Sequence, residues 1–125
     1  MMVFYITLGG IVGTLSRYFV QAWLQTRPGV GTFPLGTLAI NIAGSLVLGF
    51  VIRFATGSIV ISPETRGALT IGFCGAFTTM STFSYETVAL LTDGEYWRAG
   101  LYAGGTVFGC MLATVAGLAL AGRLL

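Results

Sequence analysis

The sequence predicts an all-α membrane protein of four transmembrane helices, with a break in the third helix. Hydrophobic residues make up 55% of the 125 residues and charged residues only 8%, whereas ordinary soluble domains have roughly 25% charged residues. A helix rises about 1.5 Å per residue and the hydrocarbon core of a bilayer is about 30 Å thick, so one span takes roughly 20 residues. Four spans with short loops would use residues 1–125 as a single domain, with the lipid bilayer as its main solvent.

The same composition argues against an enzyme and against a nucleic-acid partner. The chain has no histidine and only four carboxylates, too few for the usual acid–base or metal-ligand sites within one subunit. Its net charge of +2 is too small to suggest binding to nucleic acid. Cys74 and Cys110 both fall within predicted spans and have no CxxC partner, so neither a zinc site nor a disulfide is indicated.

The apolar runs and the residues that interrupt them locate the four spans. The N-terminal run lacks the basic region of a signal peptide, so we expect it to be retained as a helix. The segment "QTRPGVGTFPLG" interrupts the pattern with prolines and glycines, and "TDGEYWR" closes the last hairpin. The expected spans are Phe4–Leu24, Thr37–Ala55, Arg66–Leu91 and Tyr96–Leu120.

The third span has a recognisable start and an irregular middle. Ser62 is a candidate N-cap, Pro63 suits the first helical position, and Glu64 lies in the first turn. Six of the ten residues from Gly75 to Ser84 are glycine or hydroxyl-bearing, which favours a break. Broken helices survive at membrane depth only where the freed backbone groups are buried or coordinate something. A simple Ser/Thr-rich kink is the alternative.

The arginines are balanced between the two sides of the predicted bundle. Three of them, Arg53, Arg66 and Arg123, belong to the side of the termini, and Arg17, Arg27 and Arg98 to the other. Because lysine and arginine in the flanking loops set orientation, such a chain is expected to insert both ways. Our hypothesis is an antiparallel homodimer of two oppositely inserted copies.

Several glycines are spaced for close helix packing, within or between subunits. These pairs are Gly9 and Gly13, Gly100 and Gly104, and Gly105 and Gly109.

Polar side chains form a stripe on the second span and a longer ladder on the fourth. Thr37, Asn41 and Ser45 recur every fourth residue and share one helix face. Helix–helix hydrogen bonding alone would explain Asn41. The ladder on the fourth span consists of Tyr102, Thr106, Cys110 and Thr114, and it extends over roughly 18 Å. It suggests a polar path, although hydroxyls bonded back to their own helix are the alternative.

Three stretches together resemble a known family. The combination of "GTLAINIAGSLVLG" in the second span, "GFCGAFTTMSTFSYE" in the third and "GGIVGTLSRY" in the first is similar to the Fluc (also called CrcB) family of small bacterial fluoride channels. The likeness covers nearly the whole chain, and the third-span signature is its most specific part. It implies a dual-topology antiparallel homodimer in the bacterial cytoplasmic (inner) membrane, with two fluoride pores at the subunit interface.

The resemblance also assigns roles to individual residues. Backbone carbonyls of Gly75 and Thr78 from both subunits would hold a structural sodium ion at the dimer centre. Arg17 and Glu86 match two charged residues of the family, and their mutual pairing would lower the free-energy cost of burying both. The residues assigned to the fluoride pore are Asn41, Met80, Ser81, Thr82, Phe83, Tyr102, Thr106, Cys110 and Thr114.

The chain departs from the family pattern at two of these positions. Met80 stands where the family usually has phenylalanine, and Cys110 stands where a hydroxyl residue is common. A thioether is flexible and presents weakly positive C–H groups, but it lacks the ring quadrupole. We expect conduction to survive both changes.

Two other classes of membrane protein compete with the channel. A small multidrug or cation exporter would need a carboxylate in its first span, and residues 1–25 contain none. A scaffold subunit would account for the glycines but not for the polar residues of the second, third and fourth spans.

Overall fold

The computed structural model describes all residues from Met1 to Leu125, and every regular element is helical. Three long helices, α1 (Met2–Gln25), α2 (Leu35–Gly57) and α6 (Tyr96–Leu124), are each long and apolar enough to cross a membrane. The remaining span is segmented into α3 (Pro63–Gly67), η1 (Ala68–Cys74), α4 (Gly75–Phe77) and α5 (Met80–Thr92). All four predicted spans are therefore present as helices, and the third is broken as expected.

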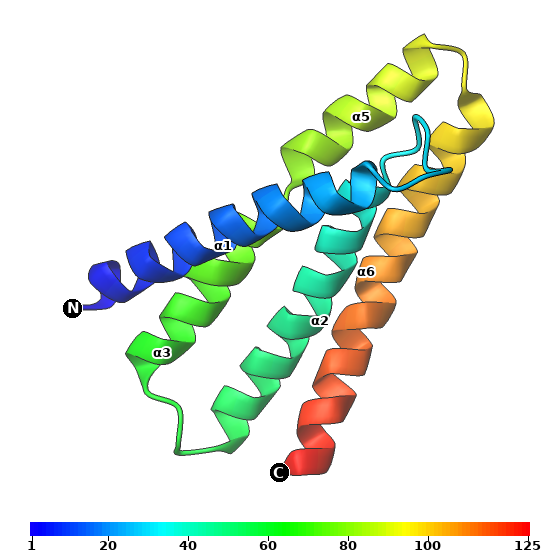
Figure 1. Ribbon diagram of the computed structural model, residues 1–125. Coiled ribbons are helices and arrows are strands. Elements are labelled where there is room, and N and C mark those ends of the chain that lie inside the picture. Colours follow the sequence, from blue (N-terminus) through cyan, green and yellow to red (C-terminus); the bar gives the residue numbers. More distant parts are fainter.

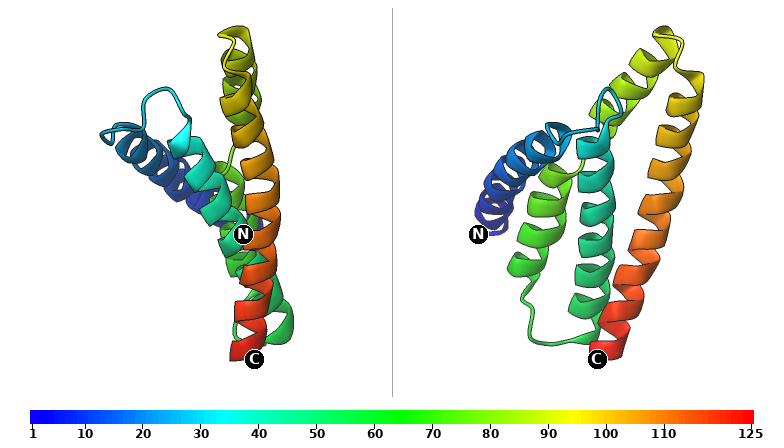
Figure 2. Two further views of the ribbon diagram at one scale, coloured as in Figure 1. Left: turned by 90° about the vertical axis from the view of Figure 1, so that its right-hand side faces the viewer. Right: turned by 45° about the vertical axis from the view of Figure 1, so that its right-hand side comes forward.

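The four spans run alternately up and down through short connections (Figure 1). Helices α2 and α6 lie side by side along most of their length, and both further views in Figure 2 agree on this pairing. Helix α1 lies obliquely against α2 and against the lower half of the third span. Helix α5 continues above the break and packs mainly on α6. The antiparallel layout follows from hairpin loops too short to allow any other arrangement.

Glycines allow the backbones of neighbouring spans to meet directly. A Cβ at Gly9 would collide with the carbonyl oxygen of Ala68, and one at Gly13 with the carbonyl oxygen of Phe73. The predicted packing of this pair therefore occurs within the chain. By contrast, a Cβ at Gly100 or Gly104 would meet nothing, so that pair lies on an unoccupied face of α6.

The lower half of the third span begins as the sequence predicts and then widens. The Ser62 hydroxyl accepts a hydrogen bond from the Thr65 N–H at 3.2 Å, with Pro63 at the first helical position. From Ala68 to Cys74 the helix has π geometry, which no sequence pattern indicated. Such wide turns are rare and occur often at functional sites. Here the π segment is followed by the short helix α4 and then by the break.

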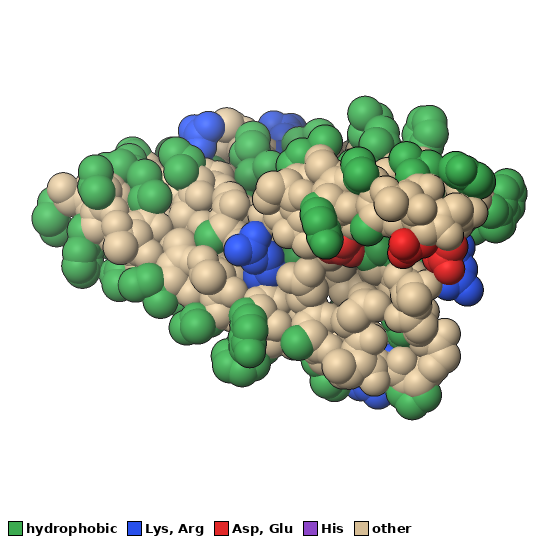
Figure 3. Space-filling model, turned by 90° about the horizontal axis from the view of Figure 1, so that it is seen from above, with side chains coloured by type: hydrophobic (Ala, Val, Ile, Leu, Met, Phe, Trp, Pro, Cys, Tyr) green, Lys and Arg blue, Asp and Glu red, His purple; other side chains and the backbone are tan.

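The surface matches a protein surrounded by lipid. Figure 3, a view from above, shows hydrophobic side chains around most of the edge, and several charged groups that gather mainly in the middle and at the right. Large apolar side chains are exposed along α1 and α6, including Phe4, Phe19, Phe108 and Leu112. The Arg27 guanidinium lies 3.9 Å from the centre of the Trp23 ring, a cation–π contact just beyond the end of α1 that suits a membrane interface.

Candidate functional site

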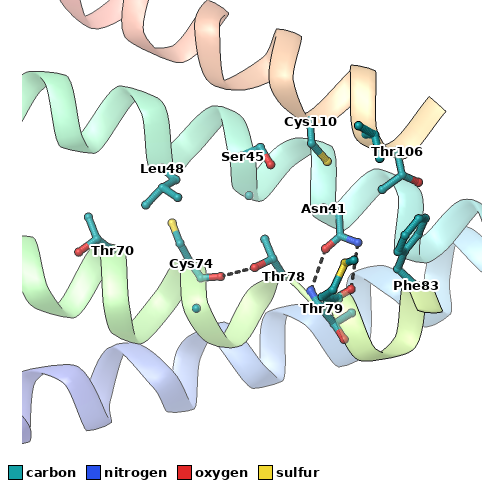
Figure 4. Close-up of a pocket in the computed structure, with 14 residues that line it drawn as sticks. Asn41, Ser45, Leu48, Thr70, Cys74, Thr78, Thr79, Phe83, Thr106 and Cys110 are labelled. Carbon is teal, nitrogen blue, oxygen red and sulfur yellow. Dashed lines mark hydrogen bonds between the residues drawn. The ribbon is translucent and has the colours of Figure 1, made fainter. Parts of the chain in front are cut away.

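A cavity of about 350 Å³ lies where the break in the third span faces α2 and α6 (Figure 4). It contains polar and sulfur-bearing side chains but no charged one. The lining residues that the sequence analysis had singled out are Asn41, Ser45, Gly75, Thr78, Met80, Phe83, Thr106 and Cys110. Residues from three distant parts of the chain are thus brought to one uncharged site.

The break itself consists of Thr78 and Thr79, both in extended backbone conformations. The N–H of Thr79 donates a hydrogen bond to Asn41 Oδ1 at 2.8 Å, and Asn41 Nδ2 donates to the Thr79 carbonyl at 3.2 Å. Asn41 is only 7% exposed, so both bonds are shielded from water. The amide of α2 therefore replaces the helical partners that Thr79 has lost.

Two threonine hydroxyls complete the ends of the interrupted helix. Thr78 donates both its N–H (3.1 Å) and its hydroxyl (2.9 Å) to the Cys74 carbonyl, which ends α4. The Thr79 hydroxyl accepts from the Thr82 N–H at 3.2 Å and so caps α5. Since the Thr79 N–H is turned to Asn41, the Gly75 carbonyl has lost its usual i+4 donor. Carbonyls of one helix end and N–H groups of another thus converge at the break.

Helix α6 supplies only part of its predicted ladder to the cavity. Thr106 is 6% exposed, lines the cavity, and has a hydroxyl without any hydrogen-bond partner. Cys110 is half-buried one turn further on. Thr114 does not line the cavity, because its hydroxyl donates to the Cys110 carbonyl at 2.9 Å and to the Ser45 carbonyl at 3.4 Å.

Tyr102, the first residue of the ladder, is fully buried and packs in the core instead of lining the cavity. Its ring centre lies 5.2 Å from that of Phe83 and 5.8 Å from that of Phe33. The Tyr102 hydroxyl has no hydrogen-bond partner. In the single chain, Tyr102 therefore supports the Phe83 ring from behind.

The predicted residues of the third span differ in their exposure. Phe83 is buried and lines the cavity, whereas Met80 also lines it but is 72% exposed. Ser81 and Thr82 do not line the cavity. The hydroxyls of both lie against that of Thr79, Ser81 at 3.3 Å and Thr82 at 3.0 Å.

The charged residues assigned by resemblance do not pair with each other. The Thr37 hydroxyl donates to Glu86 Oε1 at 2.6 Å and accepts from Gln21 Nε2 at 2.8 Å. The one ion pair within the chain joins Arg98 and Glu95 at 3.7 Å, so an Arg17–Glu86 pair does not form within a subunit. Within the chain, the side chain that reaches Glu86 is the Thr37 hydroxyl of α2.

Sequence reasoning did not assign Thr79 to the site, although Thr79 organises it. The available signal was its position three residues before Thr82, the spacing at which an N-cap hydroxyl reaches a helical N–H. Thr70, Cys74 and Val107 also line the cavity without having been predicted. The π segment contributes to this, because it changes which residues of the third span share a face.

Comparison with known proteins assigns the chain to a family. The profile of the family described as "CrcB-like protein, Camphor Resistance (CrcB)" matches residues 4–118. A protein of Chlorobium phaeobacteroides strain BS1, named fluoride-specific ion channel FluC, is 44% identical over 114 residues, which cover 90% of this chain and 87% of that protein.

Proteins of the same name from two other bacteria are about as similar. The relative from Geotalea uraniireducens strain Rf4 is 43% identical over 119 residues, covering 95% of each chain. The relative from Stutzerimonas stutzeri strain A1501 is 43% identical over 120 residues, covering 96% of each chain. The chain is therefore a multi-pass membrane protein, and it belongs to the CrcB family.

Proposed function

We propose that this chain is a fluoride-selective channel that lets cytoplasmic fluoride leave the cell by passive electrodiffusion through the bacterial inner membrane. The observation that carries the proposal is the uncharged, donor-bearing cavity at the broken third span, in a chain whose relatives are named fluoride-specific ion channels. The membrane potential drives an anion outward once a path exists.

The cavity chemistry suits a small, hard anion. The Thr106 side chain lines the cavity, and its buried hydroxyl has no hydrogen-bond partner within the chain, so we assign it as a donor to the ion. The Phe83 ring lines the same space, and aromatic edges carry partial positive charge. Fluoride holds its hydration water tightly, so the path must replace that shell with many short-range donors. A full positive charge would trap the ion, and none lines the cavity.

The pore is completed, in our proposal, by a second copy inserted in the opposite orientation. In the single chain Met80 is 72% exposed beside the cavity, and Gly75 is exposed as well. Gly100 and Gly104 leave one face of α6 open for another helix. The balanced arginines allow both orientations. Two such pores, one beside each break, would form per antiparallel dimer.

A sodium ion fits the break between the two copies. The Gly75 carbonyl has lost its helical donor, and Thr78 is the extended residue that ends the segment. Backbone carbonyls are hard oxygen ligands, which suit an alkali cation better than a transition metal. When bound, the ion would neutralise the carbonyl ends of two helices that face each other at the dimer centre.

Fluoride efflux from proteoliposomes tests the proposed function. Vesicles loaded with potassium fluoride are made permeable to potassium with valinomycin, and a fluoride electrode records the release. Chloride-loaded vesicles serve as the selectivity control. Rapid fluoride release with chloride retained is expected. If vesicles that contain a folded dimer retain their fluoride, the proposal is contradicted and the small cation exporter is favoured. Transport driven by a proton gradient would then be measured.

A substitution at Thr106 tests the site itself. Thr106→Val keeps the side-chain shape and removes the unpartnered hydroxyl, so fluoride efflux is expected to fall about tenfold, the equivalent of one hydrogen bond. Thr92→Val is the matched control, because the Thr92 hydroxyl donates to its own helix at the exposed end of α5. Equal efflux from both variants would exclude Thr106 from the path.

A further inference from the structure

The loop between α1 and α2 is connected to the cavity through a series of aromatic rings. Phe33, on this loop, is half-buried, and its ring centre lies 5.8 Å from that of Tyr102 in an edge-to-face arrangement. The Tyr102 ring lies 5.2 Å from that of Phe83, which lines the cavity at the break. Phe33 packs against the apolar cluster that contains the other two rings. A loop at the end of the bundle is therefore in packing contact with the wall of the cavity through Tyr102.

Gln25, the last residue of α1, holds the backbone on both sides of Phe33. Its Nε2 donates to the Phe33 carbonyl at 2.9 Å and to the Gly31 carbonyl at 3.4 Å, and its Oε1 accepts from the Gly36 N–H at 3.1 Å. The last of these bonds satisfies an N–H at the start of α2, where Pro34 supplies no side-chain cap. One side-chain amide thus fixes both the loop and the helix that follows it.

A second set of hydrogen bonds fixes the same loop against the start of α6. The Thr32 hydroxyl accepts a hydrogen bond from Arg98 Nη1 at 2.7 Å and donates to Glu95 Oε2 at 3.2 Å. Arg98 and Tyr102 are four residues apart on α6, so they lie on one face of that helix. The adjacent loop residues Thr32 and Phe33 therefore contact successive turns of α6, which fixes where the Phe33 ring lies along the helix.

We propose that Phe33 is a positioning residue of the fluoride path and that Gln25 holds it in place. Packed on Tyr102, the Phe33 ring limits the movement of Tyr102 and, through it, that of the Phe83 ring. Groups that bind a ligand must be held within about 0.5 Å of their working geometry by side chains that pack behind them. Contacts to a ring edge depend on direction, so they need such support. The inference rests on the proposed function, but the ring position can be measured without transport.

The surroundings of the Phe83 ring are measured first. A para-fluorinated phenylalanine is incorporated in place of Phe83 alone, and its fluorine resonance is recorded from the full chain in detergent. Phe33→Leu keeps an apolar side chain but removes the ring, and it is expected to shift or broaden this resonance. Gln25→Leu is expected to do the same, although the Gln25 side chain bonds only to the backbone of the loop and of α2. Such a change would be transmitted through the loop.

Thr26→Val is the matched control, because Thr26 follows Gln25 directly but donates its hydroxyl only to carbonyls of α1. The fluorine resonance in this variant is expected to stay at the parent position. An unchanged resonance in Phe33→Leu would overturn the positioning role of Phe33. An unchanged resonance in Gln25→Leu, or an equal shift in Thr26→Val, would overturn the role of Gln25. Gln25→Leu leaves all three rings intact, so the test stands even if Phe33→Leu does not fold.

Transport then tests the consequence for conduction. Fluoride efflux from proteoliposomes is normalised to the amount of folded protein, so a loss of stability alone does not change it. Efflux through Phe33→Leu and Gln25→Leu is expected to fall about threefold, the equivalent of one aromatic contact, and that through Thr26→Val to match the parent. A shifted resonance with parent-level efflux would overturn the role of Phe33 in the path. No efflux from the parent would contradict the proposed function instead, while the resonance result would stand.

Discussion

Asn41 uses both ends of its side-chain amide to hold the backbone of Thr79, with distances of 2.8 Å and 3.2 Å. The two residues are 38 positions apart in sequence, and the pairing joins α2 to the one non-helical point of the third span. A side-chain amide carries a donor and an acceptor side by side, so it can bind a backbone N–H and a backbone C=O at the same time. The break is therefore stabilised from outside by a single residue.

Asn41→Ala is expected to lower the free energy of unfolding by about 2–6 kcal/mol, because two buried backbone groups at about 1–3 kcal/mol each lose their partners. Thermal unfolding in detergent, followed by circular dichroism, measures this. Ser45→Ala, one turn further along α2, is the control and should change stability little. A variant Asn41→Ala as stable as the parent would show that the break does not depend on this amide.

Thr79→Val is expected to destabilise α5 by about 1 kcal/mol, since it removes the hydroxyl that caps the Thr82 N–H. Thr79→Ser retains the oxygen and should restore most of the loss. Hydrogen exchange at the first turn of α5 provides the measurement. Equal protection of that turn in the two variants would contradict the capping role.

Gly9→Ala is expected to destabilise the protein by about 1–3 kcal/mol, because the new methyl group would overlap the backbone carbonyl of Ala68. Gly10→Ala is a matched control, since a Cβ there meets nothing and alanine favours a helix. The two midpoints of thermal unfolding should therefore move in opposite directions. Similar shifts in both would argue against close packing of α1 on the third span.

Met80→Phe is expected to retain fluoride efflux, because it restores the aromatic ring that the family usually has at this position. The ring edge offers the same weakly positive C–H groups as the thioether methyl. Efflux from proteoliposomes, normalised to the amount of folded protein, is the measurement. Complete loss of efflux in a well-folded variant would mean that Met80 does not occupy an equivalent position.

Replacing sodium with a large organic cation is expected to weaken the proposed antiparallel dimer, if carbonyls of Gly75 and Thr78 from both copies hold the ion. An ion that binds only the assembled state stabilises that state by a free energy that rises with the logarithm of the ion concentration above its Kd. Size-exclusion chromatography at a series of sodium concentrations measures the effect. A dimer fraction that does not change with the sodium concentration would contradict the assignment of a sodium site to the break.

The sequence alone was sufficient to predict the four spans and the existence of the break. Apolar runs of membrane-crossing length are a local property of the sequence. The start of the third span can likewise be recognised from residues within one helical turn, the Ser62 cap and Pro63 at the first helical position. The dense group of glycine and hydroxyl residues after Cys74 likewise weakens a helix wherever the helix is placed. These features depend on neighbours in sequence and not on the partners in space.

The tertiary structure decided which groups meet. Helical spacing shows that Thr37, Asn41 and Ser45 share a face, but not that Asn41 would meet Thr79 and Thr37 would meet Glu86. It also cannot show that Tyr102 packs under Phe83 while Thr106 lines the cavity. The physical reason is that sequence periodicity fixes only the direction of each side chain around its own helix axis. The rotation and depth of each helix are set by its contacts with the other helices. In this protein those contacts include the close backbone approaches at Gly9 and Gly13.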